Sequence, residues 1–451
     1  MGRAAIVGTT LCAVGASVLM SAPASAQTLE RASTVEKGSL IYFHKVEVIW
    51  NEAGEVVQDT FISITNDRNL GPINVQMYFI NGDDPVYDDN GVQVEPGWNW
   101  TDQAITMTKD QPAWWSAWTG RPGPAGAGSG AVAPWWSLDP DGRPCPDNPD
   151  LRCVRGFIVG WVVDDNGEEI RWNHLKGEGT IVNYVRGFAW EYNTLNFKVV
   201  AEGTADGDAP DGTPGELQMD GVEYASAFDR LVLNFQASGS RAWGDPLITE
   251  APIPVESDTD VTLHPLSIDL RQNNDGPACT KADILVWNEN ETKMSGNHRC
   301  ICCWDQTLMS VYHLPETAPP AVRTFLRDVL QTDHGKAVID GHAANLCNVD
   351  FDPDDDLPLG DDPRDIVTEE YSLYGVAARI LELDPNAISR WAAAGSNMVG
   401  KGDQAATLIY TPDVGGNEEG DFFPETPEEI VNWLERNAGL QVNDGKSTNR
   451  R

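Results

Sequence analysis

The stretch RCICCWD, residues 299–305, is the densest set of residues able to do chemistry, because it gathers Cys300, Cys302 and Cys303. The two-residue gap between Cys300 and Cys303 occurs in small-ring disulfides and in zinc sites, since a tight turn brings both sulfur atoms to one side. No second cysteine pair completes a tetrahedral zinc site, and no convincing helix start follows Cys303, as a thioredoxin-like centre would need. Structural disulfides are the leading interpretation, with a metal site or thiol-redox chemistry at Cys300 and Cys303 as alternatives.

Four further cysteines lie beyond the N-terminal apolar run: Cys145, Cys153, Cys279 and Cys347. Cys145 and Cys153 enclose the polar turn PDNPDLR, and we expect a local disulfide there rather than two free thiols. One arrangement of the others joins two of the three clustered cysteines to Cys279 and Cys347, but spacing leaves the connectivity open. The total outside the apolar run is odd, so one thiol is free or links two chains.

A second candidate site is the acidic stretch 347–365, which places Asp350, Asp352, Asp354 and Asp356 on alternate positions. Closely spaced carboxylates repel one another unless a hard cation neutralises them, and calcium binds six to eight such oxygen atoms. The EF-hand pattern fails, because an aspartate stands where the loop needs glycine. Calcium is therefore one interpretation of this stretch, and a solvated acidic loop is the other.

A third candidate site is the tryptophan cluster in the long Pro- and Gly-rich insertion 111–153. Its members are Trp114, Trp115, Trp118, Trp135 and Trp136. Exposed indole rings stack on sugar rings and on other proteins, so the cluster is a candidate ligand surface. The alternative is that the insertion folds back and buries its tryptophans as a lid on the core.

Motifs that would identify an enzyme are missing: the sequence has no G-x-S-x-G elbow, H-E-x-x-H helix, P-loop or dinucleotide fingerprint. A glycosidase, however, needs only two carboxylates in a rigid cleft, and the 69 acidic residues offer many such pairs. A non-catalytic role is therefore expected, with a secreted carbohydrate-active hydrolase as the alternative.

The N-terminal pattern predicts a location outside the cytoplasm, and the charge balance restricts the expected partners. Residues 1–26 combine an early arginine, an apolar run and a small-residue site, which is the pattern of a secretory signal peptide. No other run is long and apolar enough to span a membrane, so we expect a secreted or periplasmic protein. A net charge of -38 repels nucleic-acid phosphates and anionic lipids, which excludes nucleic acid as an expected partner.

The elements that must position these residues are mainly strands. Period-two patterns joined by short turns predict that residues 27–205 form an antiparallel β-sandwich or jelly-roll domain. In residues 39–50 the pattern places Tyr42, His44, Val46, Val48 and Trp50 on one face and Lys45 and Glu47 on the other.

A Gly-, Asp- and Pro-rich linker or loop is expected at 206–217, and a second β-rich domain with added helices at 218–451. Helices are expected at 320–332 and 426–440, while 371–385 fits either a strand or a helix.

Several stretches resemble an uncharacterised family of predicted secreted bacterial proteins built from two β-rich halves. In the first half these are KGSLIYFHKVEVIWN, DTFISITND and VQMYFINGD, and in the second half ADILVWNENE and RCICCWDQTLMS. The resemblance implies the two-part β architecture and assigns no function. We therefore expect a secreted binding or surface/matrix protein, stabilised by disulfides and by calcium if the acidic loop binds it. An extracellular polysaccharide or a surface protein is its expected partner.

Overall fold

The computed structural model describes residues 31–69, 72–88, 93–123, 131–146, 148–164, 167, 169–200, 206–207, 216–243, 253–270, 279–294, 297–312, 330–331, 333–342, 372–383, 390–405 and 407–411. The expected signal peptide, the aspartates Asp350, Asp352, Asp354 and Asp356, Cys347, and the expected helix at 426–440 lie outside these residues, as does all of the expected helix at 320–332 except residues 330 and 331. Within them the protein is mainly β, as the sequence predicts, and no described helix is long and apolar enough to cross a membrane.

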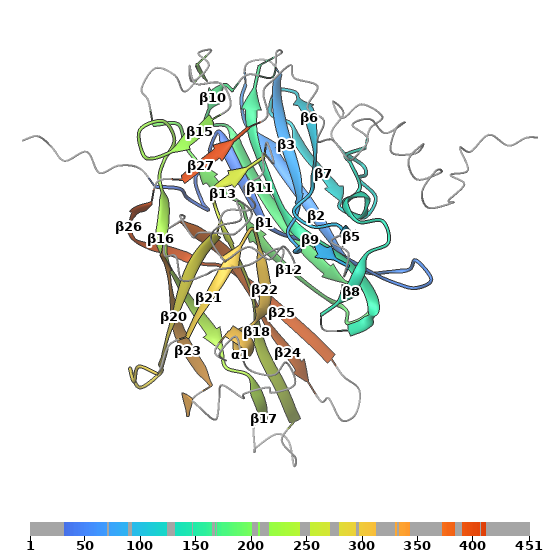
Figure 1. The fold of residues 1–451 in the computed structure, drawn as a ribbon, viewed down its shortest axis with the longest axis vertical. Coiled ribbons are helices and arrows are strands. Elements are labelled where there is room, and N and C mark those ends of the chain that lie inside the picture. The colour runs from blue at the N-terminus through green and yellow to red at the C-terminus, as the bar shows by residue number, and fades with distance from the viewer. Residues whose placement is uncertain are drawn as a thin grey trace, which may run out of the picture.

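The first half, residues 31–200, is built on a ten-stranded antiparallel sheet with the main order β12-β11-β2-β1-β9-β3-β6 (Figure 1). Strands β13, β7 and β8 pair with β1, β2 and β9 respectively. The strands are β1 (Leu40–Asn51), β2 (Val56–Asn66), β3 (Ile73–Asn81), β6 (Trp100–Met107), β7 (Pro112–Ser116), β8 (Arg143–Cys145), β9 (Asn148–Val163), β11 (Leu175–Asn183), β12 (Phe188–Asn193) and β13 (Leu195–Phe197). Two small pairs accompany the sheet: β4 (Val86–Tyr87) with β5 (Gln93–Glu95), and β10 (Arg171–Trp172) with β14 (Asp206–Gly207).

The second half, residues 216–411, contains two five-stranded sheets and a small third one. The first has the order β21-β20-β23-β16-β26, with β16 (Ala227–Gln236), β20 (Cys279–Asn288), β21 (Asn297–Cys302), β23 (His334–His342) and β26 (Val399–Ala405). The second has the order β17-β18-β24-β25 with β22 on β18, and comprises β17 (Gly239–Trp243), β18 (Ile253–Pro265), β22 (Asp305–Leu308), β24 (Leu373–Leu383) and β25 (Arg390–Asn397). The third joins β15 (Glu216–Met219), β27 (Thr407–Tyr410) and β19 (Ile268–Asp269), and the β19–β27 pair is parallel. One helical turn, α1 (Met309–Tyr312), follows β22.

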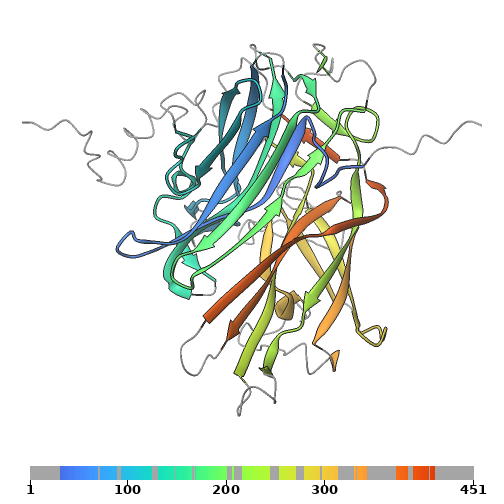
Figure 2. The same cartoon turned by 180° about the vertical axis from the view of Figure 1, so that it is seen from behind.

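Both faces of the first-half sheet are buried. One face, with Ile62, Val75 and Ile158, packs under the tryptophan insertion, and we call this cluster the lid core. The other face, with Tyr42 and Trp161, joins residues of the second half in one continuous cluster, the shared core. Figure 2 shows the two halves in contact from behind. A sheet covered on both faces explains why all but two of the residues of β1 are fully buried.

A β-bulge in β1 changes the direction of its side chains. The register against β9 shifts between Phe43 and Val46, so that one extra residue enters β1. Ile41 and Phe43 lie in the lid core before the bulge, and Val46 lies there after it. The uninterrupted alternation expected from the sequence is therefore wrong at this point. Lys45 and Glu47 face away from the lid core, opposite Val46 and Val48, and they are buried because the second half covers that face.

The insertion 111–153 is more regular than a loop. It contains β7, β8, the start of β9 and the 3-10 helix η1 (Trp135–Leu138). Its anchor is Asp59 of β2, whose carboxylate accepts hydrogen bonds from Ser116 Oγ at 2.6 Å and from the Trp118 amide at 2.9 Å. In the second half, residues 373–383 form strand β24, which settles the alternative between strand and helix for that stretch.

Candidate functional site

We call the region where the first-half sheet meets the second half the junction. On its first-half side, polar side chains are linked to one another in a chain. Asn183 Nδ2 donates to Gln58 Oε1 at 3.1 Å, and Gln58 Nε2 donates to Glu47 Oε2 at 2.6 Å. Glu47 Oε2 lies 3.8 Å from Lys45 Nζ. All four residues are buried. When buried polar side chains satisfy one another's hydrogen bonds in this way, the network holds them in one arrangement.

The same chain continues into the second half through Asp260 of β18. Lys45 Nζ donates to Asp260 Oδ2 at 2.6 Å, across 215 positions of sequence. Gln306 Nε2 of β22 donates to the same oxygen at 3.1 Å. The side chains of Lys45 and Asp260 are 2% and 14% exposed, so this is an ion pair inside the protein rather than on its surface.

A cavity of about 240 Å³ lies at this junction. Its wall combines the polar chain with apolar and aromatic side chains, including Phe188 and Trp190 of β12 and Ile380 of β24. Residues of both halves line it, so the cavity exists only when the halves are packed together. Concave sites with an apolar wall and a few fixed polar groups are typical of small-molecule binding.

Three buried polar atoms in the cavity wall have no hydrogen-bond partner among the described residues: Asp260 Oδ1, Gln306 Oε1 and Arg155 Nε. Two are acceptors and one is a donor. Burial of a polar atom without a partner is costly, so such atoms mark places where water or a ligand completes the hydrogen bonds.

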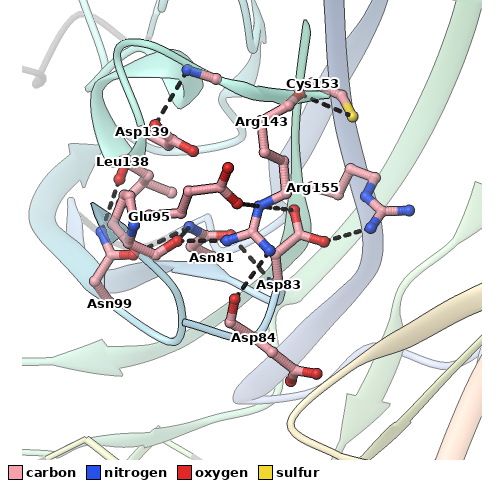
Figure 3. Close-up of polar contacts among 12 residues, drawn as sticks. Asn81, Asp83, Asp84, Glu95, Asn99, Leu138, Asp139, Arg143, Cys153 and Arg155 are labelled. Atoms are coloured by element: carbon pink, nitrogen blue, oxygen red, sulfur yellow. Dashed lines mark hydrogen bonds and ion pairs between the residues drawn. The ribbon is translucent and has the colours of Figure 1, made fainter. Parts of the chain in front are cut away.

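Arg155 is held by a network in the loops of the first half (Figure 3). Asp83 accepts an ion-paired hydrogen bond from Arg155, and Arg143 Nε lies 3.6 Å from the other oxygen of Asp83. Arg143 also donates to the backbone carbonyls of Asp84 and Pro96. Burial alone would lower the pKa of Arg155, but the charge and hydrogen bond of Asp83, together with nearby Cys153 and Glu47, raise that pKa. The guanidinium is therefore a fixed positive group at the edge of the cavity.

Within the RCICCWD stretch, two cysteines form disulfides, one cysteine is a free thiol, and the tryptophan packs into the junction. Cys302 forms a disulfide with Cys279 between neighbouring strands β20 and β21, and Cys300 is also disulfide-bonded. Cys303 is a free thiol, and burial together with the nearby charges of Asp84 and Asp83 raises its pKa well above the usual value. A thiol held in its protonated form is a poor nucleophile and a poor metal ligand.

Trp304 extends from the second half and packs against the first half. Its Nε1 donates to the His44 carbonyl at 2.9 Å, and its ring lies 5.5 Å from the Arg155 guanidinium. A Cβ atom on Gly82 would lie 2.6 Å from the Trp304 Cβ, so only glycine leaves room for this approach. RCICCWD is thus tied to the junction through its tryptophan, while its Cys302 is bonded to Cys279 within the second half.

Cys145 and Cys153 lie close together as buried free thiols rather than as the expected disulfide. A hydrogen bond to Cys153, and then burial, raises the pKa of the Cys145 thiol. Cys145 lines the junction cavity, and Cys153 Sγ donates to the Arg143 carbonyl at 3.8 Å. The two cysteines are neighbours, as expected, but the predicted disulfide between them is not formed.

The five tryptophans of the insertion differ in exposure. Trp115 and Trp135 are 1% and 2% exposed and belong to the lid core. Trp118 and Trp136 are half-buried against the same core. Trp114 is 53% exposed and packs beside Phe61 with ring centres 6.1 Å apart. Four of the five thus act as a lid, and Trp114 is the member that offers an open ring to solvent.

Two buried histidines meet in the shared core beneath the polar chain. His44 Nδ1 and His264 Nε2 are 2.7 Å apart, and His264 Nδ1 lies 2.8 Å from the Pro265 carbonyl. Because a carbonyl only accepts, His264 carries its proton on Nδ1 and accepts from His44 on Nε2. Burial lowers the pKa of both imidazoles, to about 4 for His264, so both rings are neutral at neutral pH.

No group of three or more His, Cys, Asp or Glu side chains in the described part of the chain is placed to hold a metal ion. The expected calcium ligands lie outside that part. The junction residues were missed by sequence reasoning, because Lys45 and Asp260 lie far apart in the chain. The one local signal was a lysine and a glutamate within an otherwise apolar strand.

The fold and cavity define a mainly β, antiparallel protein of two packed halves with a polar site between them. No protein-family model and no curated protein matches the chain. Among solved structures it is similar to a chain of the Cowpea mosaic virus top component, the naturally occurring empty particles, with 10% identity, a TM-score of 0.15, and 87% of this chain and 96% of that chain covered. It is also similar to a beta-glucuronidase from glycoside hydrolase family 2, with 7% identity, a TM-score of 0.11, and 83% of this chain but 26% of the glucuronidase covered. Likenesses at these scores carry no argument about function.

Proposed function

We propose that this protein is a secreted, non-catalytic binding protein whose ligand occupies the junction cavity. The observation that carries the proposal is the cavity itself, whose wall contains both hydrogen-bonded amide groups and aromatic rings. Gln58 and Asn183 present amides, Gln306 presents an unpartnered acceptor, and Trp190 presents an aromatic ring.

These groups suit a small carbohydrate unit, such as the end of an extracellular polysaccharide. Sugar hydroxyls donate to and accept from side-chain amides, while the C–H face of a sugar ring stacks on an indole. A hydroxyl group would supply the donor that Gln306 Oε1 lacks. The cavity volume of about 240 Å³ suits one small ring better than a long chain segment.

A tryptophan-fluorescence titration with a panel of extracellular sugars and polysaccharide ends tests the proposal. We expect one class of sugar to change the emission and to raise the unfolding temperature of the wild-type protein. Asn183→Leu should abolish both effects, because it removes amide contacts from the cavity wall. Trp114→Ala is the matched control, since that ring lies outside the cavity, and it should bind like the wild type.

Three results would count against the proposal. If no sugar changed the fluorescence or the unfolding temperature, carbohydrate would be excluded as the ligand class. Loss of binding in Trp114→Ala but not in Asn183→Leu would move the site to the exposed face of β7. Release of reducing sugar during the titration would favour the carbohydrate-active hydrolase instead.

A further inference from the structure

Lys45, Asp260 and Glu47, three of the ionisable side chains of the junction, have an arrangement that a salt bridge alone does not require. Lys45 Nζ lies 2.6 Å from Asp260 Oδ2 and 3.8 Å from Glu47 Oε2. The exposed fractions of the three side chains are 2% for lysine, 14% for aspartate and 9% for glutamate. An amine, a carboxyl group and a second carboxyl group are thus enclosed together, away from bulk water.

We propose that Lys45 and Asp260 join covalently, through an amide bond between Nζ and Cγ, and that Glu47 transfers the protons. The bond would tie β1 of the first half to β18 of the second half. It concerns the maturation of the protein and does not depend on which ligand, if any, the cavity binds.

The reaction is a condensation that releases one water molecule. Nζ attacks Cγ of Asp260, the C–N bond forms, and one C–O bond of the carboxyl group breaks. Of the three protons on the ammonium group, one stays on the amide nitrogen and two leave with the departing oxygen as water. Glu47 carries protons from Nζ to that oxygen and returns to its starting state. Nothing is oxidised or reduced, and one positive and one negative charge disappear together.

The surroundings of Asp260 distinguish its two oxygen atoms. Oδ2 accepts from Gln306 Nε2 at 3.1 Å, so the amide can stabilise the charge that develops on this oxygen when Nζ attacks. Oδ1 has no hydrogen-bond partner among the described residues, and Asp260 lines the cavity. Oδ1 is therefore the oxygen that leaves, and the cavity is where the water goes.

Burial and proximity favour the condensation. An ion pair removed from water has lost much of the hydration that stabilises separate charges, and an amide has no charge to solvate. The two reacting groups are also held in contact by strands of two packed halves, which replaces a collision in solution with a fixed geometry. The Trp190 ring, 5.7 Å from Nζ, further limits the access of water to the amine.

The mass of the full-length secreted protein tests the proposal. The protein is denatured, reduced and alkylated, so that disulfides no longer affect its mass, and is compared with a Lys45→Arg variant made in the same way. Arginine keeps the positive charge beside Asp260, but its guanidinium does not condense with a carboxyl group. After correction for the substitution, the wild type should be lighter by one water, and digestion should give a branched peptide containing Lys45 and Asp260.

Each alternative outcome has a definite meaning. A wild type at full mass, with Lys45 in a linear peptide, would overturn the proposal and leave an ordinary buried salt bridge. A Lys45→Arg protein that also lacks one water would place the bond elsewhere and overturn the assignment. The Glu47→Gln variant keeps both Lys45 and Asp260. We expect it either to retain its full mass or to lose water at least tenfold more slowly than the wild type. Condensation at the wild-type rate would remove Glu47 from the mechanism.

Discussion

The tryptophan insertion is built from residues close together in the sequence, whereas the junction is built from residues far apart in it. The insertion concentrates five tryptophans within 23 residues of chain, yet most of them are buried as a lid on one face of the first-half sheet. The junction is assembled from Lys45, Glu47, Asp260 and Gln306, which no local pattern connects. A dense cluster in sequence thus fills a core, while the polar site is made by distant residues.

The physical reason is that apolar and charged side chains need different surroundings when they are buried. Apolar side chains gain from any burial, so neighbours in sequence can share one core. A buried charge needs an opposite charge at a particular position, and that position is supplied by whichever strand packs against it.

Removal of Asp260 should have the largest effect on stability. Asp260→Ala deletes the proposed bond, which closes a separation of 215 residues and is worth about 5 kcal/mol by loop entropy. It also leaves Lys45 buried without its partner. Urea unfolding measures the loss. The control is Asp67→Ala, which breaks the exposed Lys37–Asp67 pair and should cost less than about 1 kcal/mol. Equal losses at both sites would show that the junction pair is no different from a surface pair.

Adjacent tryptophans in β7 give the next comparison. Trp115→Ala empties part of the lid core and should cost about 3–5 kcal/mol, whereas Trp114→Ala, at a ring 53% exposed, should cost about 0.5 kcal/mol. Thermal and urea unfolding of the two variants measure the difference. If Trp114→Ala were the more destabilising variant, the description of the insertion as a lid with one outward-facing ring would be wrong.

Sequence reasoning captured the β class of the fold and the burial alternative for the tryptophan insertion. It also anticipated one arrangement in which Cys279 pairs with a member of the RCICCWD cluster, and the structure identifies that member as Cys302. It failed at the bulge in β1, because a period-two pattern has no means of showing one extra residue. Lys45 and Glu47 lie on the face opposite Val46 and Val48, as expected, but they are buried instead of exposed because the second half covers that face. Their partner Asp260 depends on how two halves pack, which no local pattern encodes.

Acid should weaken the shared core through its histidines. The pKa of His264 is about 4 in the folded protein against 6.5 ordinarily, because burial disfavours its charged form. The unfolded chain therefore takes up a proton below about pH 6.5 that the folded protein takes up only near pH 4. The contribution of His264 to stability is complete above pH 6.5 and falls, by up to about 3 kcal/mol, as pH drops toward 4.

Carboxyl groups oppose this effect, so a variant is needed to isolate it. Among them is Asp139, whose pKa burial raises to about 6, so that it favours the folded state as pH falls through that value. The difference in unfolding free energy between the wild type and His264→Asn, measured from pH 7 to pH 4, cancels these contributions. A difference that does not change with pH would mean that His264 does not titrate differently in the two states.

The smallest effect concerns reactivity rather than stability, and it compares the two kinds of cysteine in RCICCWD. Cys303 should not react with iodoacetamide in the native protein, because burial raises the pKa of its thiol and little thiolate forms. After denaturation without a reductant, Cys303 should be alkylated while Cys279 and Cys302 stay protected by their disulfide. Peptide mapping locates the label. Rapid labelling of Cys303 before denaturation would show that the junction opens in solution, and it would favour the alternative interpretation of RCICCWD as a thiol-redox site.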